Sequence, residues 1–171
     1  MSKRYLIAVI AAILILFSAK VYAYAPKAPN IKGNVLNAGL SGYKQINLHR
    51  LAKKGYKAIV INFWATWCPP CRAELPLLNK EYEIYKNKGI LFIGVNVNVT
   101  NAGVKSFVKG FKLEYPIIHA SYSEIMGYGG VNFIPQTFFI NNRGRIIFHW
   151  QGALNGEILN TVLNKIISLE K

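Results

Sequence analysis

The chain contains no aspartate, and only two of its 171 residues are cysteines. All seven acidic residues are glutamates. This composition excludes mechanisms that need a pair of aspartates, a metal held by aspartate or a Ser/His/Asp triad. His49, His119 and His149 are too far apart for metal-ligand spacing, and the chain has no second cysteine pair to complete a zinc site. We therefore expect neither a metal nor another cofactor.

The few acidic residues leave a formal net charge of +14. Removing Lys3, Arg4 and Lys20 with the N-terminal segment still leaves 14 − 3 = +11. The remaining lysines are scattered, without the dense cluster or interleaved aromatic residues of a nucleic-acid site. We expect no nucleic-acid partner and interpret the charge as a solvated surface that can lie near anionic lipid.

Residues 1–25 have the order of an export segment. Lys3 and Arg4 precede an uncharged run over residues 5–19 that is apolar except for Ser18, and residues 5–25 are long enough to span a bilayer if Lys20 snorkels. Alternatively, small residues at Ala23 and Ala25 permit cleavage. We predict a signal-anchor or a signal peptide, with the rest of the chain exported.

Residues 26–43 carry two prolines, three glycines and little periodicity. This pattern predicts a tether between the N-terminal segment and the domain. Residues 44–171 are then a single domain, long enough to bury a core.

The two cysteines fall at a strand-to-helix corner. The apolar run Ala58–Trp64 predicts a buried strand, and residues 68–87 predict a helix. Cysteines on the first helical turn can approach to disulfide distance. Helix amides and the macrodipole would stabilise a thiolate at Cys68, the outer and more exposed sulfur. We predict a reversible pair in which Cys68 attacks and Cys71 resolves; a purely structural disulfide would stabilise little by closing so short a loop.

Two segments resemble the thioredoxin superfamily, specifically the ResA, TlpA and CcmG type of extracytoplasmic thiol/disulfide oxidoreductases. They are residues 62–76, NFWATWCPPCRAELP, and residues 134–146, IPQTFFINNRGRI. The resemblance extends over roughly residues 35–168. It implies an α/β thioredoxin fold, a central mixed β-sheet flanked by helices, with the helix/strand insertion of this family. Members are also tethered to a membrane, which favours a retained anchor.

Local patterns place the remaining elements. The expected strands are residues 44–48, 90–97, 116–120, 136–141 and 145–151, the last two joined by a hairpin turn. Helical turns are expected over 48–54 and 101–111, after a capping box at Ser121 and Glu124, and after an N-cap at Asn155.

Glu74 follows Cys71 by three residues, so on a helix it shares the face of that cysteine. A half-buried carboxylate there can take the proton of Cys71 and raise the pKa of both thiols. The alternative is an ordinary acid near a helix N-terminus. The resemblance favours the functional role, because ResA-like members tune their cysteines with the matching glutamate. Asn62 stands where cytoplasmic thioredoxins carry a buried aspartate, and we expect it to be a hydrogen-bonded buried amide.

Pro69 and Pro70 have no amide proton, so two donors that could face Cys68 are missing. We therefore predict only a moderately lowered pKa for Cys68 and a reducing potential.

The resemblance also assigns a substrate-binding surface. It implies that the Ile134–Pro135 bond is cis and faces the cysteine pair, although most X-Pro bonds are trans. The backbone of Ile134 would then pair with an extended substrate segment. Trp67 would belong to the apolar docking surface, its alternative being plain packing, and Pro69 and Pro70 are also expected to bind substrate.

These expectations describe a protein-disulfide reductase at the extracytoplasmic face of the membrane, or in the periplasm if cleaved. The resemblance implies exported proteins with disulfides as substrates, apocytochrome c among them, and a membrane thiol carrier as electron donor. We expect a monomer. A general disulfide oxidase or isomerase and a non-enzymatic metal-chaperone or assembly role are the alternatives; the short connections leave no room for the large helical insertion of the oxidant family.

Overall fold

The computed structural model describes residues 25–169. The predicted export segment therefore lies outside the described residues except for Ala25. Within the described range, no helix is both long and apolar enough to cross a membrane.

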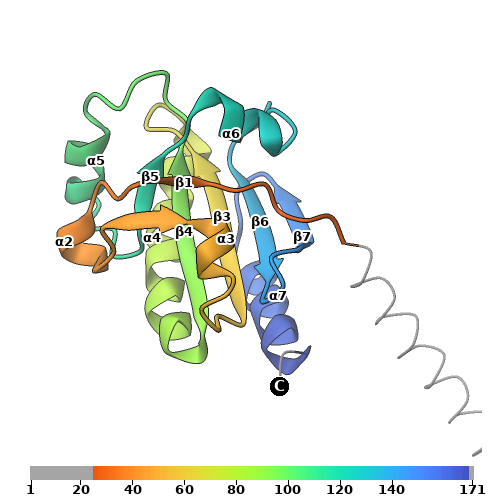
Figure 1. Cartoon of the computed structure of the whole chain (residues 1–171). Helices are drawn as coiled ribbons and strands as arrows, with labels where there is room; N and C mark the ends of the chain where they lie inside the picture. The colour runs from red at the N-terminus through yellow and green to blue at the C-terminus, as the bar shows by residue number, and fades with distance from the viewer. Residues whose placement is uncertain (1–24, 170–171) are drawn as a thin grey trace, which may run out of the picture.

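A five-stranded sheet in the order β5-β4-β3-β6-β7 forms the centre of the molecule (Figure 1). Its strands are β3 (Ala58–Trp64), β4 (Ile90–Asn96), β5 (Ile117–His119), β6 (Gln136–Asn141) and β7 (Ile146–Gln151). β3 pairs in parallel with β4 and antiparallel with β6, so the predicted mixed sheet is confirmed. Every residue of β3 and β4 is buried, which explains why their sequences are almost continuously apolar.

Helices cover one face of the sheet, and a small antiparallel pair of strands with two short helices covers the other (Figure 1). The first layer contains α4 (Pro69–Tyr85), the 3-10 turn η1 (Lys86–Lys88) and α7 (Gly156–Leu169), and the second contains β1 (Lys32–Asn34), β2 (Gln45–Asn47), α2 (Ala38–Ser41) and α3 (Leu48–Leu51). The Tyr85 hydroxyl joins α4 to α7 by donating to Asn160 at 2.7 Å. Leu159, Leu163 and Ile166 form the buried stripe of α7.

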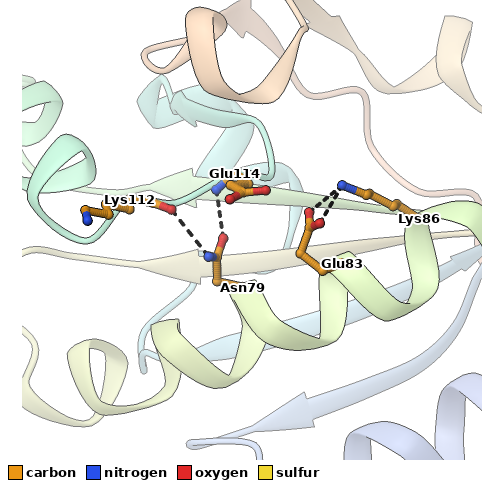
Figure 2. A network of polar contacts seen from close by, with 5 residues as sticks. All are labelled: Asn79, Glu83, Lys86, Lys112 and Glu114. Carbon is orange, nitrogen blue, oxygen red and sulfur yellow. Dashed lines mark hydrogen bonds and ion pairs between the residues drawn. The ribbon is translucent and has the colours of Figure 1, made fainter.

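The insertion between β4 and β6 consists of α5 (Val104–Gly110), β5 and α6 (Tyr122–Gly127). The predicted capping box at Ser121 and Glu124 opens α6. Asn79 of α4 holds the loop before β5 (Figure 2): its Oδ1 accepts from the Glu114 amide at 2.7 Å, and its Nδ2 donates to the Lys112 carbonyl at 3.3 Å. These bonds fix the insertion against the active-site helix.

The predicted tether over residues 26–43 is wrong, because this segment is part of the folded domain. Lys32–Asn34 forms β1 and pairs with β2. Ala28 and Ile31 are 1% and 0% exposed. Backbone bonds begin even earlier, since the Ile146 amide donates to the Pro26 carbonyl at 2.9 Å. A three-residue strand with single buried anchors on either side leaves no periodic signal, which is why the sequence pattern suggested a linker.

Replacing Ile31 with alanine tests this correction. We expect the free energy of unfolding to fall by about 2 to 5 kcal/mol, since a fully buried Ile leaves a cavity. Leu40→Ala is the matched control, because Leu40 lies in the same segment but is 54% exposed and should change stability by less than about 0.5 kcal/mol. Urea unfolding followed by circular dichroism measures both. Equal, small effects would restore the tether interpretation.

Candidate active site

The cysteine pair closes the first turn of α4. Cys68 is the N-cap residue, and its Sγ accepts a hydrogen bond from the Cys71 amide at 3.2 Å. The two sulfurs form a disulfide across a Cα–Cα distance of 5.3 Å. Pro69 and Pro70 occupy the first two helical positions, where a missing amide proton costs the helix nothing. Cys71 therefore supplies the amide that reaches the Cys68 sulfur.

Cys68 is much less exposed than its place at the helix tip predicted. Its residue exposure is 3%, compared with 0% for Cys71, so the order of the two is as predicted but the outer cysteine is nearly covered. Its Sγ lies 3.8 Å from the Ile134 carbonyl oxygen, on the loop that leads into β6. This tertiary contact comes from a residue 66 positions away, which local helix geometry did not reveal.

The Ile134–Pro135 peptide bond is cis, as the resemblance implied. The next residue, Gln136, holds this loop: its Nε2 donates to the Phe133 carbonyl at 2.6 Å, and its Oε1 accepts from His149 Nε2 at 2.8 Å. The carbonyl of Ile134 and the Cys68 sulfur are thus brought together by β3, α4 and β6.

Exposed apolar side chains surround this end of the sheet. Trp67 is 66% exposed, as its predicted docking role requires, and Phe133 and Val99 are 71% and 99% exposed. Trp67 and Val99 follow the ends of the parallel strands β3 and β4, and Phe133 precedes the antiparallel strand β6. All three therefore lie at the same end of the sheet as the disulfide. Phe133 and Val99 were not among the predicted site residues; their only signal in the sequence is a large apolar residue in a loop at this end of the sheet.

Asn98 clamps the loop before Cys68. Its Oδ1 accepts from the Thr66 amide at 3.1 Å, and its Nδ2 donates to the Thr66 hydroxyl at 2.8 Å. Asn96, fully buried at the end of β4, supports Asn98 through two further bonds at 3.2 Å. This double contact fixes the entry of the chain into the active site.

Glu74 lies behind the disulfide and is 3% exposed, more buried than predicted. One carboxylate oxygen accepts from Asn62 Nδ2 and the other from the Leu154 amide, both at 2.8 Å. Burial raises the pKa of Glu74 to about 7, although the bonds from Leu154 and Asn62 act in the opposite direction. Glu74 can therefore gain or lose a proton near neutral pH, the property needed in a proton acceptor for Cys71.

Asn62 is the buried amide that was expected, and its contacts link it directly to Glu74. Besides the bond to Glu74, its Nδ2 donates to the Thr137 hydroxyl at 3.0 Å, whereas its Oδ1 is buried without a hydrogen-bond partner in the described part of the chain. A half-turn of the amide would direct Oδ1 towards Glu74, where it can accept the proton of the neutral acid. In the orientation observed, Asn62 donates to Glu74 and therefore favours the carboxylate over the neutral acid.

Replacing Asn62 with leucine should raise the pKa of Glu74, because a donor that stabilises the carboxylate is lost. We expect the pH dependence of disulfide reduction to move upward by about one pH unit. Thr137→Val is the matched control, since it removes the other partner of Asn62 and leaves Glu74 bonded. Reduction rates measured between pH 5 and 9 would show no shift in N62L if the amide merely fills space.

In the described part of the chain, no group of three or more His, Cys, Asp or Glu side chains is arranged to hold a metal ion.

Comparison with known proteins agrees with this geometry. A model of the AhpC/TSA family matches residues 25–149. The thiol-disulfide oxidoreductase ResA of Bacillus thuringiensis subsp. konkukian is 37% identical over 123 residues, which are 72% of this chain and 69% of that protein. ResA of Oceanobacillus iheyensis is 32% identical over 147 residues, 86% of this chain and 74% of that protein.

Among solved structures, a thiol:disulfide interchange protein of the thioredoxin family from Chlorobium tepidum superposes with a TM-score of 0.71. It is 26% identical and covers 84% of this chain and 97% of its own. A disulfide at the start of α4, a cis-proline loop facing it and relatives of this kind lead to one assignment. The chain belongs to the AhpC/TSA family and, within it, to the thiol-disulfide oxidoreductases of the ResA type.

Proposed function

We propose that this protein reduces disulfides in exported proteins at the outer face of the cytoplasmic membrane, in the maturation of c-type cytochromes. The observation that carries the proposal is the Cys68–Cys71 disulfide at the tip of α4, with the Glu74 carboxylate buried behind it. The proposed substrate is apocytochrome c, whose haem-binding cysteines must be reduced, or the thiols of its assembly partners. The names of the ResA relatives support the chemistry, and the N-terminal sequence supports the location.

In the first step, the Cys68 thiolate attacks one sulfur of a substrate disulfide. A mixed disulfide forms between Cys68 and the substrate, and the other substrate sulfur leaves as a thiolate. The exposed surface of Trp67, Val99 and Phe133 suits an unfolded, partly apolar segment, and the backbone of Ile134 can align it as an added strand.

In the second step, Cys71 transfers its proton to the Glu74 carboxylate and its thiolate attacks Cys68 Sγ. The Cys68–Cys71 disulfide forms, the mixed disulfide breaks and the second substrate sulfur leaves. Two electrons have then passed to the substrate. A dithiol of a membrane thiol carrier would restore the reduced pair by the same exchange chemistry, and its own thiols would be oxidised.

The reduction potential of the pair and its choice of substrate test this function. Within residues 25–169, Cys68 Sγ accepts one backbone hydrogen bond, from the Cys71 amide. We therefore expect a potential closer to that of thioredoxin, about −270 mV, than to that of the periplasmic oxidant, about −120 mV. The reduced protein should also reduce a Cys-x-x-Cys-His disulfide peptide faster than the disulfide of a folded secreted protein. A potential near −120 mV, or net oxidation of the peptide, would instead support a disulfide oxidase.

A further inference from the structure

The charge of this protein is divided unequally along the chain. Residues 25–73 contain eight lysines and arginines and no acidic residue, because the first glutamate is Glu74. Six exposed cations lie around the turn that contains α3, and we call this group the basic face; it consists of Lys27, Lys32, Arg50, Lys53, Lys54 and Arg143. In residues 25–169 none of these six forms an ion pair.

The basic face is concave on both sides of α3. On one side, an open cavity of about 570 Å³ is lined by Lys32, Arg50 and Lys54 together with the polar side chains of β1 and β2. On the other, a cavity of about 330 Å³ is lined by Lys27, Lys53 and Arg143. The neighbouring carboxylate, Glu124, accepts hydrogen bonds from the Lys32 and Ser121 amides and is engaged in the capping box. Each cavity therefore presents three cations to an anionic ligand.

The first described residues of the chain, which follow the apolar N-terminal sequence, lie next to the basic face. Arg145 Nη1 donates to the Ala25 carbonyl at 2.6 Å, and the Ala28 amide donates to the Gly144 carbonyl at 2.9 Å. The described chain thus begins beside the β6–β7 turn and crosses the front of the sheet to β1 (Figure 1). Since residues 26–43 are folded, there is no spacer between the apolar N-terminal sequence and the basic face.

We propose that the basic face binds the anionic headgroups of the membrane that holds the N-terminus. This inference rests on the membrane attachment proposed above. Lys27 follows the apolar sequence by two residues, a reach of at most about 7 Å, which is within the Debye length of about 8 Å at physiological ionic strength. An acidic protein would also match the charge, but the short distance to the membrane favours lipid. The domain would then rest on the bilayer through α3, with α4 and α7 on the far face.

Lysine acetylation of the full chain in lipid nanodiscs tests this proposal. We compare discs of neutral phosphatidylcholine with discs that contain phosphatidylglycerol. Lys27 and Lys53 should be acetylated at least about fivefold more slowly in the anionic discs, and the protection should disappear at about 1 M salt, where the Debye length is about 3 Å. Lys80 on α4 and Lys165 on α7 are internal controls and should not change.

Paired variants sharpen the result. Lys53→Gln with Arg143→Gln should remove most of the protection of Lys27, whereas Lys80→Gln with Lys165→Gln, which changes the net charge equally, should leave it intact. Equal acetylation in both kinds of disc, or equal protection on α4 and α7, would overturn the lipid assignment of the basic face and leave the redox function untouched. A chain absent from both kinds of disc would overturn the membrane attachment itself.

Discussion

Replacing Cys71 with serine is expected to turn the protein into a covalent trap for its substrates. Cys68 can still attack a disulfide, but no sulfur stands behind it to break the mixed disulfide. A tethered thiol acts at a very high effective concentration, so its loss should lengthen the lifetime of the mixed disulfide by at least about 10³-fold. Non-reducing electrophoresis of membrane fractions, followed by mass spectrometry of the captured proteins, measures this accumulation.

The cysteines provide their own controls. Cys68→Ser should capture nothing and should abolish reduction, because the attacking sulfur is gone and Cys71 is fully buried. Apocytochrome c or its assembly proteins among the captured species would support the proposed pathway. If C71S reduced disulfides as fast as the native protein and trapped no partner, the two-cysteine mechanism would have to be abandoned.

Replacing Glu74 with glutamine should slow resolution of the mixed disulfide by about 10²-fold, the usual contribution of a positioned general base. In the native protein the resolution rate should rise with pH around pH 7, because only the carboxylate can accept the proton of Cys71 and the pKa of Glu74 is about 7. In the variant, the resolution rate should no longer show this rise around pH 7. Rapid mixing with an oxidised peptide, followed by tryptophan fluorescence, measures both effects.

Although Glu74→Gln should slow catalysis, it should increase the free energy of unfolding near neutral pH. The pKa of Glu74 is about 7 when folded, compared with 4.5 ordinarily, so between these values the folded protein binds more protons than the unfolded chain. The stability conferred by the neutral acid is complete below pH 4.5 and is lost as the pH rises through 7. Above pH 7, the buried carboxylate lowers the free energy of unfolding by about 3 kcal/mol relative to its value below pH 4.5.

Glutamine at position 74 carries no charge at any pH, so the stability of the Glu74→Gln variant should not fall as the pH rises through 7. A rotated Asn62 amide can accept from the new side-chain amide, and the Leu154 amide can still donate to its oxygen. The variant should therefore gain stability relative to the native protein between pH 5 and pH 8 in urea unfolding. Asn79→Ala, which removes a contact of α4 without altering a titratable group, should show a pH-independent difference. A difference for E74Q that is also independent of pH would mean that the buried carboxyl does not titrate in this range.

The regular elements were predictable because their signals are local. β3 and β4 are continuous apolar runs, and α6 opens with a capping box of two residues in one turn. The start of α4 was equally clear, since Pro69 and Pro70 are typical of the first turn of a helix. By contrast, β1 has no periodic pattern, because its burial comes from Ile31 on one side and Val35 on the other.

The composition, the Cys68–Cys71 spacing and the two motif segments were sufficient to identify the chemistry and the fold, because disulfide exchange requires only two sulfurs one helical turn apart. Only the tertiary structure decided the surroundings of Glu74 and Cys68, on which the pKa of Glu74 and the exposure of Cys68 depend. The contacts of Glu74 come from Asn62, 12 positions before it, and from Leu154, 80 positions after it, and the cover over Cys68 comes from Ile134. Such contacts depend on the packing of β3, α4 and β6 against one another, and no local pattern of side chains encodes them.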